Sequence, residues 1–374
     1  MRQPRLVFFV TEDWYFCSHR LPLACAARAA GFDVAVVTRV QRHAAQIRDA
    51  GIELIPIDLA RSSKNPFTES RTLSQLIRIY RRLKPDIVHH VALKPVLYGT
   101  IAARLAGVPT VINALAGLGY LFSSMDFAAR LSRPLLEIGF RTLLKPNRVI
   151  VQNPDDRQLL VERGLINAQR TTLIRGSGVD LAAFAPAPEA NGIPLIVLPA
   201  RLLWDKGVGE FVAAARLLRQ QNVAARLALV GAPDPANPAS VPQATLEAWR
   251  AEGVVELWGW RDDMAQVFRD CHVACLPSYR EGLPKALLEA AACGRPLVTC
   301  DVPGCREVVR HGINGLLVPL RNPAALAAAL KQLVENPQQR AVFGRAARDL
   351  AAAEFSLSAV IDQTLALYRE LAPA

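Results

Sequence analysis

Along the first half of the chain, short apolar runs alternate with longer segments in which apolar residues recur at helical spacing. The short runs are rich in Val and Ile, which predicts buried strands at residues 5–10, 33–38, 52–57, 85–90, 109–114 and 147–152. The longer segments predict helices, for example at residues 21–30, 72–83, 96–106 and 127–144. Strands separated by helices of this length form a parallel sheet covered by helices on both faces. Gly31, Gly51 and Gly107 follow three of these helices, where a left-handed residue ends a helix best.

The same alternation starts again in the second half. Strands are predicted at residues 194–200, 225–231, 254–260, 273–278, 296–301 and 315–319. Helices are predicted at residues 208–221, 243–251, 264–271, 283–292, 323–334 and 359–371. Between the halves, residues 184–194 are rich in Pro and Ala and lack periodicity, which indicates a linker.

We therefore expect an α/β protein with two Rossmann-like, doubly wound domains, at residues 1–183 and 195–355, and a terminal segment at 356–374. Such domains bind ligands at the carboxyl ends of their strands, in a cleft between them. The loop after the first strand, TEDWYFCSHR, lacks the glycine fingerprint of dinucleotide-binding folds, which disfavours a nicotinamide enzyme.

The positive charge lies entirely in the first half. The net charge is +11; residues 1–185 contain 25 Lys and Arg against 14 Asp and Glu, and the remaining residues contain 19 of each. Anionic phospholipids, a polyphosphate substrate and nucleic acid each explain such a surplus, as does an ordinary solvated surface.

Two features predict a cytoplasmic protein. The apolar run Leu6 to Val10 is too short for a membrane span or a secretory leader. The seven cysteines are an odd number without a framework spacing, which favours reduced thiols over disulfides or a metal site.

Two glutamates carry the strongest chemical signal, in the stretch EGLPKALLE. Glu281, Gly282, Leu283 and Pro284 follow a predicted strand and open a predicted helix, whose first turn suits a phosphate or a sugar hydroxyl. On that helix Glu289 would lie two turns further along the same face, about 12 Å away. The pair could then hold the two ends of a nucleotide sugar: the hexose at Glu281 and the ribose at Glu289. Alternatively, Glu281 is an N-terminal helix charge and Glu289 a surface residue. The neighbours of Glu289, LLEAAACG, are however those of a buried helix, in which a carboxylate needs a partner.

The second signal is the stretch RLLWDKG, directly after the first strand of the second half. It places Arg201 and Lys206 at a strand–loop–helix junction, with Gly207 allowing a tight reversal. Two cations at the carboxyl edge of a sheet suit a diphosphate leaving group, which Arg binds in a bidentate way.

Together RLLWDKGV and EGLPKALLE resemble the retaining glycosyltransferase family 4, over nearly the whole chain. The resemblance implies the GT-B fold, in which a C-terminal helix crosses back to the first domain. It implies that Arg201 and Lys206 bind the donor diphosphate and that Glu289 binds the ribose. Glu281 and the backbone of Gly282 and Leu283 would hold the transferred sugar. Catalysis without a metal or another cofactor is implied too, in keeping with the lack of an Asp-x-Asp motif; Asp262 and Asp263 are expected to cap a helix.

A finer resemblance concerns bacterial transferases that build lipid-linked oligosaccharides and capsules, through SSKNPF, VALKPVLYGTIAARLAGVP and ALAGLGYLF. It implies a UDP-sugar donor, an acceptor sugar on polyprenyl diphosphate, and peripheral attachment to the inner face of the cytoplasmic membrane. The first-half surplus would then serve acceptor and anionic membrane binding, not nucleic acid. Arg130, Arg133, Arg141 and Lys145 interrupt an apolar segment at 125–144, as in an interfacial helix or an ordinary core-facing one.

The first domain departs from the broader family at two places. The first loop lacks the usual glycine pair, and VINALAGLG lacks a histidine. We expect His19, His90 and Lys94, which border strand ends, to line the acceptor side, and His89 to be a structural histidine.

Two other functions remain open. A nucleotide-sugar 2-epimerase shares the architecture but needs an acid–base cluster near the sugar, and no carboxylate–histidine cluster is evident. A non-catalytic nucleotide-binding subunit would not need Arg201, Lys206, Glu281 and Glu289 together.

Overall fold

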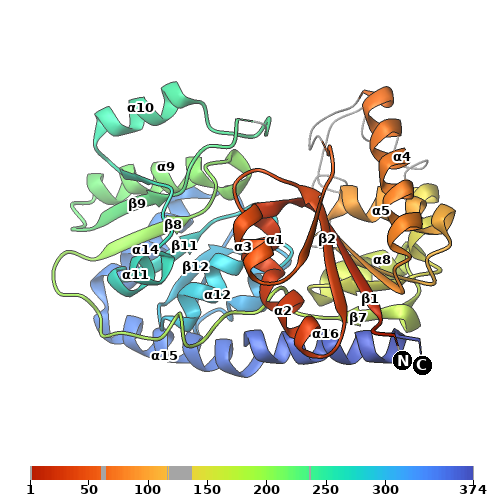
Figure 1. The fold of residues 1–374 in the computed structure, drawn as a ribbon. Coiled ribbons are helices and arrows are strands. Elements are labelled where there is room, and N and C mark those ends of the chain that lie inside the picture. Colours follow the sequence, from red (N-terminus) through yellow and green to blue (C-terminus); the bar gives the residue numbers. More distant parts are fainter. Residues whose placement is uncertain (1, 60–64, 116, 118–136, 236, 374) are drawn as a thin grey trace. The chain divides into compact units, whose positions relative to one another are not determined.

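The computed structural model describes residues 2–59, 65–115, 117, 137–235 and 237–373. The chain forms two compact units (Figure 1): unit 1 contains Met1–Ser177 and Val360–Ala374, and unit 2 contains Gly178–Ala359. The chain therefore passes from unit 1 to unit 2 and returns. The expected boundaries were residues 183 and 356, a few positions away from these two crossings.

The strands of unit 1 form one parallel sheet. Its strands are β1 (Arg5–Glu12), β2 (Asp33–Arg39), β3 (Glu53–Pro56), β4 (Ile87–Val91), β5 (Thr110–Leu115), β6 (Arg148–Val151) and β7 (Thr171–Leu173). Over the described residues the order is β3-β2-β1-β4-β5-β6-β7, with every pair parallel. The short strand β7 was not expected, because its sequence, TTL, has no apolar run.

Both faces of this sheet are buried. Leu6, Phe8 and Val10 on β1 belong to one core, and Val7 and Phe9 belong to the core on the opposite face. This alternation follows from the two-residue period of a strand. The covering helices are α1 (Asp13–His19), α2 (Leu21–Ala29), α3 (Ala44–Asp49), α4 (Pro66–Leu83), α5 (Leu93–Ala106), α8 (Pro154–Glu162) and α16 (Leu357–Leu371).

The last helix, α16, completes the core of unit 1. Tyr368 is fully buried, and its ring lies 6.5 Å from that of Phe8 and 5.9 Å from that of Phe32. Its hydroxyl is 2.5 Å from Nδ1 of His89. The C-terminal helix therefore supplies apolar side chains that the first 177 residues lack.

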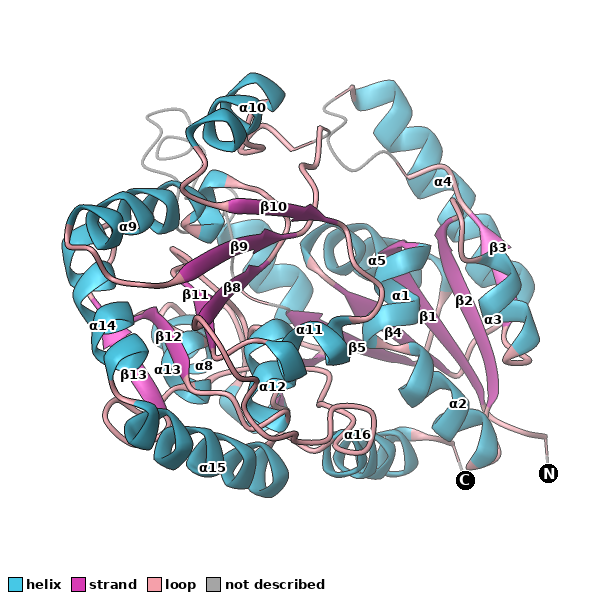
Figure 2. Ribbon diagram, turned by 90° about the vertical axis from the view of Figure 1, so that its left-hand side faces the viewer, coloured by secondary structure: helices cyan, strands magenta, loops and turns pink. Residues whose placement is uncertain are grey.

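Unit 2 repeats the scheme (Figure 2). Its strands are β8 (Leu195–Pro199), β9 (Arg226–Val230), β10 (Glu256–Gly259), β11 (Val273–Leu276), β12 (Leu297–Cys300) and β13 (Gly315–Val318). Over the described residues they form a parallel sheet in the order β10-β9-β8-β11-β12-β13. Its helices are α9 (Val208–Gln220), α10 (Gln243–Glu252), α11 (Met264–Asp270), α12 (Lys285–Ala292), α13 (Cys305–Val308), α14 (Pro323–Glu335) and α15 (Pro337–Glu354).

The expected fold class, two doubly wound parallel sheets, is confirmed. Gly31, Gly51 and Gly107 have the expected positive φ, of 94°, 72° and 73°. None of the helices in the described ranges combines the length and the apolar character that a bilayer span requires.

Three expectations were wrong or fall outside the described residues. The loop expected after β1 is instead the helix α1, and the helix expected from residue 283 begins at Lys285. Of the segment 127–144, residues 137–144 are helical, while Arg130 and Arg133 lie outside the described residues.

Candidate active site

The predicted donor residues lie where the strand order of the unit 2 sheet reverses. β8 pairs with β9 on one side and with β11 on the other, so the connections leaving β8 and β11 diverge to opposite sides. Doubly wound sheets bind ligands in the crevice at this point, outside the carboxyl ends of the strands. The connection after β8 carries Arg201 and Lys206, and the connection after β11 carries Glu281.

A glycine fixes the loop after β8 against the loop after β11. Gly207 has φ 71°, and a Cβ atom there would lie 2.1 Å from the carbonyl oxygen of Pro277. Only glycine fits this contact. Asp205 tightens it, because its carbonyl oxygen accepts hydrogen bonds from the N–H of Tyr279 (2.9 Å) and the hydroxyl of Ser278 (3.1 Å).

The two loops join through an ion pair. Nζ of Lys206 lies 2.5 Å from Oε1 of Glu281, and both side chains are largely buried. The loop after β12 packs against the backbone of Glu281. A Cβ atom on Gly304, whose φ is 79°, would lie 2.6 Å from the carbonyl oxygen of Glu281 and 2.4 Å from that of Gly282. The backbone of Glu281 is therefore held on both sides.

Arg201 has a partner that the sequence did not reveal. Its Nη1 atom lies 2.7 Å from Oδ2 of Asp234, and the Arg201 side chain is 31% exposed. Asp234 follows β9, and its own N–H donates to Oγ of Ser240 at 3.0 Å. At the end of β9, a Cβ atom on Gly231 would lie 1.9 Å from the carbonyl oxygen of Ala200, next to Arg201. The glycine that ends this strand was the only available signal.

The geometric relation expected between Glu281 and Glu289 is wrong. Pro284 has ψ 105° and lies just before the first residue of α12, so Glu281 is outside the helix. Helical geometry is also unfavourable for the residue before a proline, here Leu283, which explains why α12 begins later than expected. Glu281 and Glu289 therefore do not share a helix face.

Glu289 lies in the interior, as the apolar neighbours in its sequence indicated. Burial raises the pKa of its carboxyl, and the ammonium of Lys285, 3.3 Å away, opposes that rise. Lys285 is thus the partner that a buried carboxylate needs.

A second network supports the same loops. The hydroxyl of Tyr279 donates to Oε1 of Glu210 at 2.6 Å, and the Arg321 guanidinium lies 4.7 Å from the centre of the Tyr279 ring. Burial and the Glu210 carboxylate raise the pKa of Tyr279 to about 12. The phenol therefore stays protonated and keeps the loop after β11 attached to α9. Sequence reasoning missed this triad because its members are far apart in the chain.

The arrangement suits an anionic ligand with polar groups beside it. Arg201 and Lys206 supply two cations from one loop, and both are accessible in part. Glu281 supplies a carboxylate within reach of the same space. Cations fixed by surrounding loops stabilise charge that develops on a leaving group, because they need no reorganisation during the reaction.

No group of three or more metal-ligating side chains occurs among the residues that the structure describes. Asp263 lies at the N-terminal end of α11, but its carboxylate binds Arg261 and does not cap the helix, contrary to expectation. Asp262 instead accepts a hydrogen bond from the Trp260 indole at 2.7 Å.

The acceptor-side candidates in unit 1 divide into two groups. The ring of His19 is half-buried and stacks on Tyr15, with 4.1 Å between centroids. Lys94 lies 2.9 Å from a carboxylate oxygen of Glu69. Both border the carboxyl edge of the sheet and stay candidates.

His90 does not line a surface. It is fully buried, and its ring nitrogens lie 2.9 Å from Oδ1 of Asn113 and 3.1 Å from the hydroxyl of Tyr80. A Cβ atom on Gly99 would lie 2.5 Å from the ring, so α5 packs directly on it. The sequence predicted that His90 borders a strand end. Because successive side chains of a strand point to opposite faces of the sheet, His90 points away from His89 and into the core between β4 and α5.

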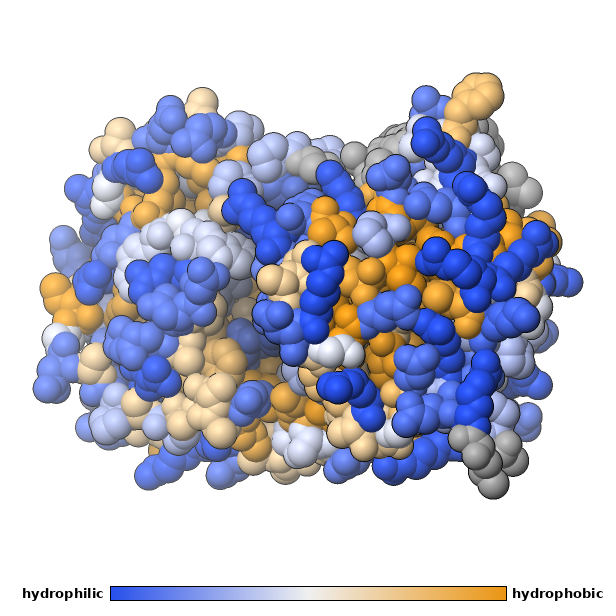
Figure 3. Space-filling model, in the orientation of Figure 1, coloured by the Kyte–Doolittle hydropathy of each residue, from blue (hydrophilic) through white to orange (hydrophobic). Residues whose placement is uncertain are grey.

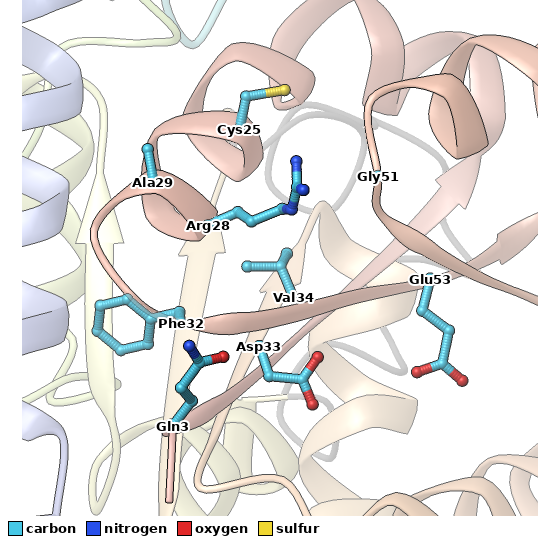
Figure 4. A pocket seen from close by; sticks show the side chains of 9 residues that line it. All are labelled: Gln3, Cys25, Arg28, Ala29, Phe32, Asp33, Val34, Gly51 and Glu53. Atoms are coloured by element: carbon cyan, nitrogen blue, oxygen red, sulfur yellow. The ribbon is translucent and has the colours of Figure 1, made fainter.

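A pocket of about 580 Å³ lies elsewhere in unit 1 (Figure 4). Gln3, Asp33 and Glu53 line it at the amino ends of β1, β2 and β3, opposite the edge where such sheets bind ligands. Its charged groups already have protein partners: Arg28 donates to the carbonyl oxygen of Ala50, and Arg5 pairs with Glu53. We do not assign it a function.

Comparison with protein families gives a match for each half of the chain. Residues 5–153 match the family described as "Glycosyl transferase 4-like", and residues 193–336 match "Glycosyl transferases group 1". The two matches together contain every strand of the two sheets except β7, and the second contains Arg201, Lys206, Glu281 and Glu289.

Among individual proteins, the chain is 28% identical to N,N'-diacetylbacillosaminyl-diphospho-undecaprenol alpha-1,3-N-acetylgalactosaminyltransferase of Campylobacter jejuni, over 93% of the chain and 94% of that protein. It is 26% identical to UDP-Gal:alpha-D-GlcNAc-diphosphoundecaprenol alpha-1,3-galactosyltransferase of Escherichia coli, over 72% of the chain and 71% of that protein.

Solved structures share the fold. Sucrose-phosphate synthase from Thermosynechococcus elongatus has a TM-score of 0.81 at 21% identity, covering 98% of the chain and 99% of that protein. HepE from Anabaena, in complex with UDP, has a TM-score of 0.77 at 18% identity, covering 98% and 100%.

Proposed function

The chain belongs to the glycosyltransferases with the GT-B fold, and on that premise we propose a retaining enzyme that uses a UDP-sugar. It moves a hexose or an N-acetylhexosamine to a sugar acceptor on undecaprenyl diphosphate. One observation carries the donor half of this proposal: Arg201, Lys206 and Glu281 converge at the strand-order reversal of unit 2.

Arg201 and Lys206 bind the diphosphate of the donor in this proposal. Glu281, beside Lys206, accepts hydrogen bonds from hydroxyls of the transferred sugar, next to the backbone of Gly282, Leu283 and Pro284. Glu289 binds the ribose from α12. Each cation already has a carboxylate at 2.5–2.7 Å, so the loops are ordered before the donor arrives.

The reaction breaks the bond between the sugar's anomeric carbon and the diphosphate oxygen. The acceptor hydroxyl forms its bond on the same face of the sugar, and its proton passes to the departing diphosphate. No protein nucleophile or metal ion takes part. Arg201 and Lys206 stabilise the negative charge that grows on the leaving group.

The choice of acceptor rests on the relatives and on charge. The two relatives named above act on sugars linked to diphospho-undecaprenol, by their names, and the excess of +11 lies in residues 1–185. The enzyme would thus work from the cytoplasm, on the inner face of the membrane, and nucleic acid is not proposed as a partner. UDP is the proposed nucleotide because the relative from Escherichia coli and HepE are named with it.

Purified chain, a panel of UDP-sugars and an undecaprenyl-diphosphate-linked sugar test the proposal. We expect the mass of the acceptor to increase by one sugar. NMR should show that the transferred sugar keeps the anomeric configuration of the donor, and EDTA should not reduce turnover. An epimer formed without acceptor indicates the 2-epimerase instead. Nucleotide binding with no product indicates a non-catalytic subunit, and an inverted product or EDTA-sensitive turnover contradicts the mechanism.

A further inference from the structure

A buried arginine in unit 1 has no counter-charge among the residues that the structure describes. Arg20 joins α1 to α2 and is 5% exposed. Among the described residues, no side chain forms an ion pair or hydrogen bond with its guanidinium, whose Nε is fully enclosed. Burying an unpaired cation is unfavourable, and proteins usually provide a carboxylate for it.

The second buried group, His89, has one ring nitrogen without a partner in the described ranges. Nε2 of His89 is enclosed and, within the described part of the chain, makes no hydrogen bond. Burial lowers the pKa of His89 well below its ordinary value, and the nearby Arg20 charge adds to this effect. The neutral ring has one N–H. The Tyr368 hydroxyl, 2.5 Å from Nδ1, can donate there, which leaves the proton on Nε2. Arg20 and His89 then both offer N–H donors.

Their place in the sheet is that of a ligand site. β1 pairs with β2 on one side and β4 on the other, so the strand order of unit 1 reverses between β1 and β4. Arg20 lies between α1 and α2, the two helices that follow β1, one turn after Phe16, whose ring packs against that of Phe8 on β1 at 5.7 Å. His89 is on β4, opposite Phe8 of β1. In unit 2, Arg201 and Glu281 likewise follow the two strands between which the order reverses.

We propose that Arg20, with the uncharged ring of His89 beside it, binds a phosphate oxygen of the acceptor's diphosphate. The inference rests on the proposed function for the identity of the acceptor, but not for the presence of an anion site. A guanidinium suits a phosphate, because Arg binds two phosphate oxygens at once. The stacked pair of Tyr15 and His19 lies on the same short helix and flanks the site.

Kinetics of Arg20→Met and Arg20→Lys in the full chain test the assignment. Loss of a charged hydrogen bond should raise KM for the lipid-linked acceptor by about tenfold to a hundredfold in the Met variant, and less in the Lys variant. KM for the UDP-sugar should not change. Arg104→Met, an exposed arginine near the end of α5, serves as the matched control. A rise in donor KM with unchanged acceptor KM overturns the assignment.

Thermal unfolding separates binding from structure. An unpaired buried cation opposes folding, so Arg20→Met should unfold at the same temperature as the unliganded wild type, or higher. A lower unfolding temperature together with an unchanged acceptor KM would make Arg20 a structural residue. If the Met variant does not fold, the Lys variant decides by the same two measurements.

Calorimetry with inorganic pyrophosphate keeps the inference independent of the proposed function. The titration uses chains carrying Arg201→Ala and Lys206→Ala, so that the donor site does not contribute. Binding that disappears with Arg20→Met supports the site even if no glycosyl transfer is found. Pyrophosphate binding that is absent, or unchanged by the Arg20 substitution, contradicts it.

Discussion

Within unit 2, Arg201 forms an ion pair with Asp234, and Lys206 forms one with Glu281. The pairs fix both cations without a ligand. A diphosphate that binds here gains ordered donors and does not have to order flexible side chains, whose immobilisation would weaken binding. The carboxylates therefore act as positioning groups for the cations, and Glu281 in addition faces the proposed sugar.

Arg201→Ala should reduce turnover by about a hundredfold or more, because it removes a fixed cation from a developing negative charge. Steady-state kinetics measure this. Arg216→Ala, which removes another arginine–carboxylate pair of unit 2, is the control and should retain activity. Both variants should unfold close to the wild-type temperature, since the pairs are partly exposed. Near-normal turnover of Arg201→Ala would refute the donor-site assignment.

Among single residues, the sequence identified those that stand in a recognisable short motif. Arg201 and Lys206 follow a clear strand, and Glu281 stands in a recognisable stretch. Asp234 and Tyr279 could not be assigned, because their partners Arg201 and Glu210 are 33 and 69 positions away. The burial of His90 depends on its contact with Gly99 of α5, which no local pattern records.

The element that begins directly after β1 is organised by one carboxylate. Asp13 is fully buried at the start of α1 and accepts hydrogen bonds from the N–H groups of Trp14, Gln41 and His43. It thus joins α1 to the loop after β2. The sequence suggested a loop here because the stretch is short and has no helical periodicity; the helix depends on this long-range contact.

Asp13→Asn should lower the free energy of unfolding by about 1–3 kcal/mol at neutral pH. Burial favours a higher pKa for Asp13, but the three N–H groups outweigh it and lower the pKa below its ordinary 3.8. A lowered folded-state pKa stabilises the fold above the unfolded-state value, about 4, and this contribution is lost as pH falls through the folded-state pKa.

Urea unfolding of the wild type and of Asp13→Asn, from about pH 3 to about pH 7, measures the difference in their free energies of unfolding across the carboxylate pKa of about 4. The difference should be constant above about pH 5 and shrink below it. Asp49→Asn, at an exposed aspartate of α3, is the control. A difference that does not depend on pH would contradict the role of the charge.

Helix α4 is the described element best suited to a membrane surface. Arg71, Arg78 and Arg82 are exposed and, at spacings of seven and four residues, share one face with Phe67, which is 83% exposed. Figure 3 shows hydrophilic side chains along the region where Figure 1 places α4, with an apolar tip at its upper end. A basic face with an exposed aromatic side chain is typical of interfacial helices.

Replacing Arg71, Arg78 and Arg82 with Gln should weaken binding to vesicles containing anionic phosphatidylglycerol. Each basic residue near such a surface contributes about 1 kcal/mol, so the partition coefficient should fall by about a hundredfold at low salt. Vesicle flotation measures it, with neutral phosphatidylcholine vesicles for comparison. Arg219, Arg250 and Arg345, exposed arginines of unit 2, form the control triple. Equal binding of both triples would exclude α4 as the docking element.

On the scale of the whole molecule, each unit has its own core. HepE and sucrose-phosphate synthase have the same overall fold at 18–21% identity, so the architecture tolerates wide replacement of side chains. The apolar periodicity was enough to predict both sheets. The position of the two crossings was not predictable to the residue, because it depends on which core receives each flanking side chain.

Tyr368→Ala should destabilise unit 1 selectively, by about 3–5 kcal/mol, because it opens a cavity and removes the partner of His89. Phe343→Ala on α15 should do the same to unit 2. Hydrogen exchange read by mass spectrometry reports on each unit separately. Exchange that rises equally in both units for either variant would contradict two separate cores.

The return of the chain to unit 1 also sets the order of events during synthesis. The ribosome makes residues 1–177 before Val360, Leu365, Leu367 and Tyr368, whose side chains belong to the same core. Unit 2 is synthesised between these two parts, and its core uses residues from Val179 to Phe355. The core of unit 1 therefore cannot be completed until the chain of unit 2 has been made, which leaves an apolar face of its sheet uncovered for longer during synthesis.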